Sequence, residues 1–367
     1  MVASKMTVND MNRLLNTVVN RNASDLHLSV GRPPSVRMNG RLISLKADPL
    51  TNEDMQVFMK SIASEKHQED LREAGSVDFG FSFEDKARFR VSLFKQRGNI
   101  GLVLRLIPNE ILPLEKVGLP HHIKTLLTRT KGLILVTGPT GSGKSTTLAG
   151  MIDYINVEMD RHIITVEDPI EFYHEHKKSI ITQREVGKDV TTFAEAIRRA
   201  LRQDPDIILV GEMRDLETIS AAISAAETGH LVMATLHTTG AAKTINRIID
   251  AFPSNEQEQI RTQLSMNVLA VISQLLIPKE PKGRVAAFEI MMMTDAIGHK
   301  IRENKIHTIA SDIQTASSRG MILMDDCLFD LFTAGVISHT EIMRWAIKPE
   351  TLAIKVQEHR ARAGAGQ

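Results

Sequence analysis

The residues with the clearest chemistry lie in one stretch, 133–147, where an apolar run leads into glycines, a lysine and hydroxyl side chains. From Gly138 to Ser145 the spacing is G-x-x-x-x-G-K-[ST], the pattern of a phosphate-binding loop between a strand and a helix. Glycines let successive backbone N–H groups converge on phosphate oxygens, Lys144 adds positive charge at the β- and γ-phosphates, and the Ser145 hydroxyl can ligate Mg²⁺. The stretch therefore predicts a nucleoside triphosphate site, whose expected residues are Gly138, Pro139, Thr140, Gly141, Ser142, Gly143, Lys144, Ser145 and Thr146.

Polar residues follow the other apolar runs in this part of the chain. Runs that alternate with helical segments predict buried strands of a mostly parallel sheet, and they cover residues 133–136, 163–166, 207–210 and 231–236. Glu167 and Asp168 follow the second run, Glu212 the third and His237 the fourth. Because ligands bind at the carboxyl ends of parallel strands, we expect these side chains beside the phosphate loop. We assign Glu212 to orienting or deprotonating the attacking water, and Glu167 to the Mg²⁺ shell, through water.

The first 106 residues are predicted to form a small α+β domain. An amphipathic helix lies within the first 19 residues, and short antiparallel strands follow, with a turn at Asn39-Gly40. A helix is then expected over residues 51–74, with Thr51 as its N-cap and the Asp54 carboxylate reaching back to it.

Alternating apolar residues up to residue 106 then predict a β-meander, which carries Arg88, Arg90, Arg97 and Arg105 on or beside its strands. The alternation places the neighbouring phenylalanines on the opposite, buried face. Two interpretations are open. The arginines form a solvated, positively charged sheet face, or some of them contact the nucleotide from outside the phosphate loop.

Composition narrows the class of protein. A net charge of +1 and an aromatic content of 4% indicate no general affinity for nucleic acid. The single cysteine, Cys327, excludes an intrachain disulfide and a Cys-rich zinc site, and we interpret it as a small buried hydrophobe. No apolar run approaches the roughly 18 to 20 residues that span a bilayer, so a soluble, cytoplasmic protein without direct membrane insertion is expected.

Two further segments complete the predicted organisation. Residues 107–120 contain three prolines and a glycine and are interpreted as an interdomain linker, which leaves residues 121–367 for the second domain. The end of the chain, from about Lys348, is interpreted as a frayed helix end or a disordered extension.

The motifs of this chain resemble those of the secretion ATPase superfamily, and most closely those of the PilT-like type IV pilus retraction ATPases. The matching segments are ASDLHL (23–28), ARFRVSLFKQRG (87–98), GPTGSGKSTT (138–147), ITVEDPIEF (164–172), TQREVG (182–187), LRQDPDIILVGEMRD (201–215) and TGHLVMATLHT (228–238). The resemblance implies an α/β protein, with a PAS-like α+β N-terminal domain followed by a RecA-like phosphate-loop ATPase domain with C-terminal helices.

The same resemblance implies a homohexameric motor that hydrolyses ATP with Mg²⁺ and powers pilus retraction and twitching motility. It implies that Glu212 is the catalytic glutamate and that His230 and His237 form a histidine pair at the site. It favours phosphate contacts for at least one of Arg88, Arg90, Arg97 and Arg105. It also implies a cytoplasmic location, peripheral at the inner membrane through an inner-membrane pilus platform protein, with no nucleic acid as partner.

Alternatives remain within and outside this family. The segments AIGHKIR (296–302) and GMILMDD (320–326) depart from the retraction pattern, and others look like the accessory retraction paralogue PilU. A nucleic-acid translocase would share the RecA-like ring, but the neutral charge and the few aromatic residues disfavour it. A nucleotide-gated scaffold without hydrolysis is disfavoured because both Lys144 and Glu212 are present.

Overall fold

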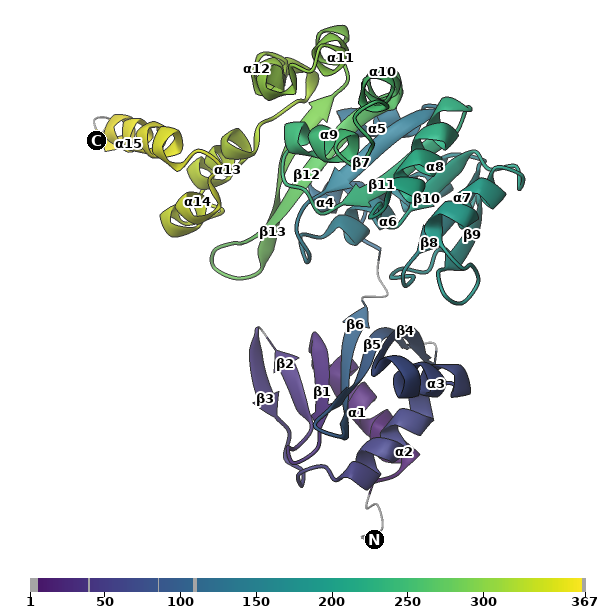
Figure 1. The fold of residues 1–367 in the computed structure, drawn as a ribbon. Coiled ribbons are helices and arrows are strands. Elements are labelled where there is room, and N and C mark those ends of the chain that lie inside the picture. The colour runs from purple at the N-terminus through teal and green to yellow at the C-terminus, as the bar shows by residue number, and fades with distance from the viewer. Residues whose placement is uncertain (1–5, 39, 85, 108–110, 365–367) are drawn as a thin grey trace. The chain divides into compact units, whose positions relative to one another are not determined.

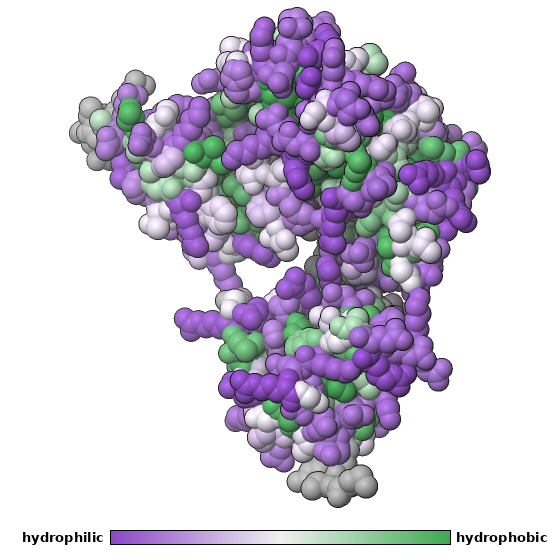
Figure 2. Space-filling model, in the orientation of Figure 1, coloured by the Kyte–Doolittle hydropathy of each residue, from purple (hydrophilic) through white to green (hydrophobic). Residues whose placement is uncertain are grey.

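The computed structural model describes residues 6–38, 40–84, 86–107 and 111–364, with side chains described as far as residue 361. The chain divides into two compact units (Figure 1). Unit 1 comprises residues 1–110 and 169–173, and unit 2 comprises residues 111–168 and 174–367. On the face drawn in Figure 2, hydrophilic residues predominate and hydrophobic ones lie singly or in small groups, as is normal for a surface that faces water.

Unit 1 is built on a six-stranded antiparallel sheet with the strand order β3-β2-β1-β6-β5-β4. The strands are β1 (Asp25–Ser29), β2 (Ser35–Met38), β3 (Arg41–Ser44), β4 (Ser76–Phe83), β5 (Ala87–Gln96) and β6 (Asn99–Ile107). Helices α1 (Val8–Asn20), α2 (Asn52–Ile62) and α3 (Glu65–Ala74) pack on the sheet (Figure 1). The meander and the earlier short strands are confirmed. Of the predicted turn at Asn39-Gly40, Asn39 lies outside the described residues.

The sheet of unit 1 has one apolar face and one charged face, because successive side chains of a strand point to opposite sides. Residues directly opposite each other on neighbouring strands share a face, so the strand register defines rows across the sheet. One row is apolar and buried against the helices, and it consists of Val36, Leu26, Leu104, Val91 and Phe79. The adjacent row points the other way and consists of Arg37, Asp25, Arg105, Arg90 and Gly80. Charged groups therefore gather on the face opposite the helices.

The helical conformation predicted over 51–74 is confirmed, but two helices with a break at residues 63–64 fill this range in place of one. Ala63, with φ −99° and ψ 127°, leaves the helical conformation after α2, and the Ser64 hydroxyl accepts a hydrogen bond from the His67 N–H to cap α3. A serine that caps a new helix ends the preceding one. The predicted start of α2 is confirmed, because Thr51 and Asp54 form a reciprocal capping box.

Unit 2 is built on a seven-stranded sheet with the order β13-β12-β7-β11-β10-β8-β9, parallel throughout except for β13. Its strands are β7 (Gly132–Thr137), β8 (His162–Glu167), β9 (Ile180–Glu185), β10 (Ile207–Val210), β11 (Leu231–Leu236), β12 (Val268–Pro278) and β13 (Arg284–Met292). The four strands predicted from apolar runs are confirmed. Strand β9 and the β12-β13 hairpin were not predicted, although β12 pairs directly with β7 beside the phosphate loop.

Helices cover both faces of this sheet. Residues of β7 alternate between the two resulting cores, with Leu133 and Leu135 on one side and Ile134 and Val136 on the other. The helices are α4 (Leu114–Val117), α5 (His122–Leu127), α6 (Lys144–Glu158), α7 (Phe193–Ala200), α8 (Leu216–Glu227), α9 (Ala241–Ile249), α10 (Gln257–Asn267), α11 (Asp295–Arg302), α12 (Ile309–Thr315), α13 (Met324–Thr333), α14 (His339–Trp345) and α15 (Pro349–Gly364), with 3₁₀ turns η1 (Ile306–Thr308) and η2 (Ser317–Arg319). A strand buried on both faces explains the unbroken apolar runs in the sequence.

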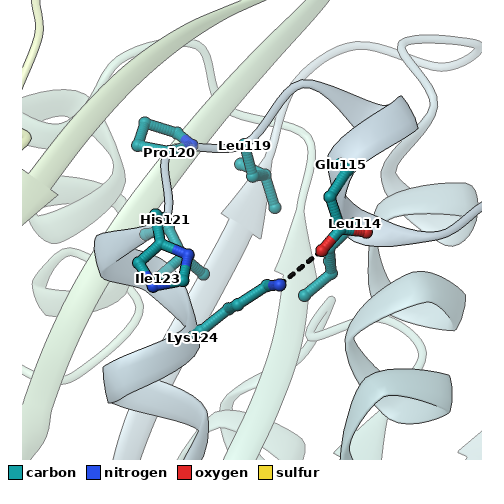
Figure 3. A pocket seen from close by; sticks show the side chains of 7 residues that line it. All are labelled: Leu114, Glu115, Leu119, Pro120, His121, Ile123 and Lys124. Atoms are coloured by element: carbon teal, nitrogen blue, oxygen red, sulfur yellow. Dashed lines mark hydrogen bonds and ion pairs between the residues drawn. The ribbon is translucent and has the colours of Figure 1, made fainter.

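Most of the segment interpreted as a linker is ordered structure of unit 2. Its residues 108–110 lie outside the described residues, but α4 follows, and Leu114 and Val117 are buried in the core of unit 2. Figure 3 shows the small hollow between α4 and α5, where Lys124 pairs with Glu115. The Lys124 ammonium also lies 5.0 Å from the centroid of the Tyr154 ring. Pro113 therefore precedes the first turn of α4 and Pro120 lies in the turn before α5, so both belong to the packed structure of unit 2.

The end of the chain is also more regular than expected. Helix α15 occupies Pro349–Gly364, and Leu352 and Val356 are buried against α13 and α14. Residues 365–367 lie outside the described residues. The earlier interpretation of a frayed or disordered end is wrong for most of this segment, because an apolar pair four residues apart gives the helix a face to bury.

Candidate active site

The phosphate loop joins the carboxyl end of β7 to the first turn of α6, as its sequence predicts. Gly138 has φ 143°, and a Cβ there would overlap the backbone carbonyl oxygen of Gln274 and lie 2.7 Å from Ser142 Oγ. Gly143, at φ 91°, is the N-cap of α6. Positive φ favours glycine at both positions, and the close approach of the Gln274 backbone requires it at Gly138. The loop is therefore shaped by contact with β12 as well as by its own sequence.

Lys144 is buried and lies within the loop, with 9% of its surface exposed. Its Nζ donates hydrogen bonds to the carbonyl oxygens of Gly138 at 2.9 Å and Pro139 at 3.1 Å. Below it, the Thr147 hydroxyl donates to Gln274 Oε1 at 2.7 Å. The ammonium group thus sits at the centre of the glycine-rich turn, which is where a positive charge is needed to hold phosphate oxygens.

Glu212 and His237 lie together at the edge of the sheet that carries the phosphate loop. His237 Nε2 is 3.0 Å from Glu212 Oε1, and His237 Nδ1 is 3.5 Å from the Thr140 hydroxyl in the loop. Arg214 contacts the other carboxylate oxygen, Oε2, at 2.7 Å. The prediction that strand ends would bring Glu212 and His237 to the phosphate loop is confirmed. The histidine is the bridge between the carboxylate and the loop.

The charge of Glu212 is controlled by these neighbours. Burial alone raises the pKa of its carboxyl group, but the hydrogen bonds and charges of Arg214 and His237 outweigh it and hold the pKa below the ordinary value. The hydrogen bond to Glu212 in turn raises the pKa of Arg214. The carboxylate is therefore ionised at neutral pH and able to accept a proton or a hydrogen bond from water.

Glu167 lies at the same edge but farther from the phosphate loop. Its Oε1 accepts hydrogen bonds from the Thr165 hydroxyl at 2.7 Å and from Gln183 Nε2 at 3.3 Å. It ends β8, and β11 and β10 stand between β8 and β7. Strands are about 4.8 Å apart, so Glu167 starts roughly 14 Å from the loop strand. This arrangement is consistent with an indirect contact to a metal and not with direct ligation.

His230 does not join His237 at the site within this chain. It precedes β11, whereas His237 follows it, so the two residues lie at opposite edges of the sheet. The His230 carbonyl oxygen accepts a hydrogen bond from Gly132 N, at the amino end of β7, and its Nδ1 is 3.0 Å from the Ala225 carbonyl oxygen. The expected histidine pair is therefore separated by the length of one strand.

The four arginines of unit 1 have different surroundings. Arg88 is buried, with 4% exposed, and its guanidinium lies 4.1 Å from the centroid of the Tyr173 ring, which also belongs to unit 1. Arg97 stands in the β5-β6 turn at φ 49°. Arg90 and Arg105 are opposite each other on β5 and β6, and Arg105 Nε donates to Asp25 Oδ1 at 2.9 Å. The interpretation as a solvated sheet face is therefore confirmed for Arg105, whose side chain is 64% exposed, and is wrong for Arg88.

Three contributors were missed by reasoning from the sequence. Gln274 supports the phosphate loop from β12, Arg214 pairs with Glu212, and Tyr173 covers Arg88. Only Arg214 had a local signal, since it is a cation two residues from a carboxylate that follows a buried strand.

Comparisons with known proteins agree with this geometry. The family model described as "Type II/IV secretion system protein" matches residues 2–323. The type IV pilus retraction ATPase PilT of Pseudomonas aeruginosa is 49% identical over 341 residues, which cover 93% of this chain and 99% of that protein. The ATPase PilU of the same organism is 38% identical, covering 95% of this chain and 91% of that protein.

A solved structure agrees as well. The crystal structure of the pilus retraction motor PilT with bound ADP superimposes with a TM-score of 0.87 at 48% identity, covering 95% of this chain and 99% of that one. The structure of the Legionella pneumophila ATPase DotB reaches a TM-score of 0.79 at 30% identity, covering 92% and 95% of the two chains. These matches extend over both units. The chain belongs to the type II/IV secretion system protein family and, within it, to the PilT-like type IV pilus retraction ATPases.

Proposed function

We propose that this chain is the ATP-hydrolysing motor subunit that powers type IV pilus retraction and twitching motility. The observation that carries the proposal is the contact chain from the phosphate loop through Thr140 and His237 to Glu212. It links an ionised carboxylate to the loop that would hold the nucleotide phosphates, which supports a role for Glu212 in hydrolysis. The 49% identity to PilT over nearly its whole length supports the same activity.

The loop, Lys144, Glu212 and His237 have separate roles in this reaction. Backbone N–H groups of the loop between Thr140 and Thr146 bind the phosphates, and Lys144 turns its ammonium from the loop carbonyls to the β- and γ-phosphate oxygens. Glu212 orients a water molecule and accepts its proton as the water oxygen bonds to the γ-phosphorus and the bond to the bridging oxygen breaks. ADP and inorganic phosphate are the products. His237 keeps the Glu212 carboxylate in place beside the loop through the contact between Nε2 and Oε1.

Mg²⁺ fits this site through few protein ligands. Among the described residues, no group of three or more His, Cys, Asp or Glu side chains could hold a metal by itself. Mg²⁺ bound with a nucleotide keeps several waters and takes one or two protein ligands, so the Ser145 hydroxyl in the first turn of α6 is sufficient. Glu167 would join the shell through water. When bound, the ion would neutralise negative charge on the phosphates.

The working form we propose is a homohexameric ring, as the family resemblance implies. Arginines of unit 1, of which Arg97 and Arg105 are exposed, would add charge-stabilising contacts to the nucleotide phosphates. Changes in nucleotide state would then move the two units and act on an inner-membrane pilus platform protein. No helix among the described residues is long and apolar enough to cross a membrane, so this location is proposed to depend on the pilus machine.

A role as an accessory PilU-like paralogue is the second candidate, and the identities of 38% to PilU and 49% to PilT favour the principal motor. A nucleic-acid translocase is less favoured, because the net charge is +1 and the charged row of unit 1 is short.

The test is steady-state ATP hydrolysis by the full-length protein, with and without single-stranded DNA. We expect Glu212→Gln to lower turnover by about 10²-fold or more, because it removes the group that accepts the proton. Glu217→Gln is the matched control, since Glu217 is exposed in the first turn of α8 and should leave turnover unchanged. Wild-type turnover in the Glu212 variant would refute its assignment. Stimulation by DNA would favour the translocase.

A further inference from the structure

Asp25 is a buried carboxylate on the charged face of the unit 1 sheet, and the ATPase reaction as described above gives it no part. The residue is 4% exposed, although it lies in the middle of the row Arg37-Asp25-Arg105-Arg90. A buried charge is costly unless it is paired and hydrogen-bonded. Its location therefore calls for an explanation in terms of the arginines on either side.

Both carboxylate oxygens of Asp25 are used. Oδ1 accepts a hydrogen bond from Arg105 Nε at 2.9 Å. Oδ2 accepts one from the Ser24 hydroxyl at 2.8 Å and lies 3.7 Å from Arg37 Nε. Burial raises the pKa of Asp25, but the hydrogen bonds from Ser24 and Arg105 outweigh it and lower the pKa. The carboxylate is therefore an ionised anchor between two guanidinium groups.

The two arginines are held in different ways. Arg37 also donates from Nη1 to the Gly40 carbonyl oxygen at 3.0 Å, so its guanidinium is engaged at both ends. Among the residues that the structure describes, the hydrogen bond found for Arg105 leaves from Nε alone. Its side chain is 64% exposed, against 39% for Arg37. The Arg105 guanidinium is therefore held at Nε, while most of the side chain is exposed.

A guanidinium fixed through Nε presents its two terminal nitrogens as a fork that matches two oxygens of a phosphate. Fixing the side chain before the ligand arrives removes part of the conformational entropy that binding would otherwise lose. We propose that Asp25 is a positioning residue for Arg105, which it directs outward from the charged face to bind phosphate oxygens of the nucleotide. This inference rests on the proposed function, in which arginines of unit 1 contact the nucleotide.

The proposal is tested with a double-mutant cycle on ATP hydrolysis by the full-length chain. Asp25→Asn keeps the shape of the side chain and removes its charge, and Arg105→Gln removes the fork. We expect each variant to lower kcat/KM by about 10-fold, and the double variant to be no worse than either one, because Asp25 acts through Arg105. Losses that multiply would instead mean that Asp25 and Arg105 act independently, and that result would overturn the proposal.

Matched variants control for charge and for folding. Asp78→Asn removes an exposed carboxylate of β4 on the same face, and Arg37→Gln removes the other guanidinium beside Asp25, so both should stay within about twofold of wild type. If Asp25→Asn does not fold, Ser24→Ala removes only one hydrogen bond of Asp25. A loss of about threefold that disappears in the Arg105→Gln background would support the proposal, and a loss that persists there would refute it.

The two levels of inference fail in different ways. If Arg105→Gln hydrolyses ATP at the wild-type rate while Glu212→Gln does not, the positioning role is refuted and the ATPase assignment stands. If Glu212→Gln retains wild-type turnover, the proposed catalytic site is itself incorrect.

Discussion

The two sheets of this protein place their charged groups in opposite ways. In unit 2 the candidate functional side chains stand at the ends of parallel strands: Glu167 is the last residue of β8, and Glu212 and His237 follow β10 and β11. In unit 1 the charges lie within antiparallel strands, in the row across the sheet that contains Asp25 and Arg105. The unit 2 sheet has its candidate site at the carboxyl ends of its strands, and the unit 1 sheet has a charged row across one face.

This difference has a physical cause. The parallel sheet is covered by helices on both faces, so polar groups are admitted only where strands end. The antiparallel sheet is covered on one face, so every second residue of its inner strands is available for charge. The geometry of the site at the strand ends depends on the backbone of the phosphate loop, whereas the charged face of unit 1 is formed by side chains. Substitutions that add one methyl group should therefore act very differently in the two regions.

The largest effect is expected at the edge, from Gly138→Ala. The new Cβ would overlap the Gln274 backbone carbonyl at a φ of 143°, and neither backbone can yield cheaply. We expect ATP turnover to fall by about 10²-fold or more, because misplaced N–H groups no longer fit the phosphates. The measurement is steady-state hydrolysis at saturating ATP.

Gly141→Ala is the control for this substitution. Gly141 also has a positive φ, of 80°, but a Cβ there meets no atom within 4 Å. Strain alone should cost about 1 kcal/mol and reduce turnover far less. Equal losses in the two variants would show that backbone strain, and not the contact with β12, limits the loop.

Residues at the carboxyl ends of the unit 2 strands could be predicted from the sequence, whereas contacts across the face of the unit 1 sheet could not. Glu212 and His237 were predictable, because each follows an apolar run and parallel strands align their carboxyl ends. The position of His230 follows from the same rule, since it precedes the strand that His237 ends, but the family motif suggested a pair. The Thr51–Asp54 capping box was predictable because its partners are three residues apart.

Long-range contacts were beyond prediction. The hydrogen bond between Thr147 and Gln274 joins residues 127 positions apart, and that between Asp25 and Arg105 joins residues 80 positions apart. Both depend on strand order and register, which a single sequence does not specify by its local pattern. The chain segment 169–173 was likewise assigned to the second domain, whereas it belongs to unit 1.

A smaller effect is expected from Arg214→Gln, which tests how the edge site tunes its carboxylate. Arg214 lowers the pKa of Glu212, so its removal should raise that pKa. A carboxylate with a lowered pKa keeps its proton-accepting form until the pH falls through that pKa. The acid limb of kcat/KM should therefore move to higher pH in the variant, while turnover at pH 8 changes little. An unchanged acid limb would mean that Glu212 does not control it.

The smallest effect is expected on the face, from Gly80→Ala. A Cβ at Gly80 would lie 2.5 Å from Arg88 Nη2, which is the far end of a flexible side chain. The guanidinium can shift across the Tyr173 ring at a cost of about 1 kcal/mol or less, so we expect a fall in Tm of a few degrees and at most about a fivefold loss of turnover. Thermal denaturation and hydrolysis of the full-length variant measure both. If Gly80→Ala lowered turnover as much as Gly138→Ala, the Arg88 side chain would be held as rigidly as the phosphate loop. The charged face of unit 1 would then tolerate an added methyl group no better than the loop does.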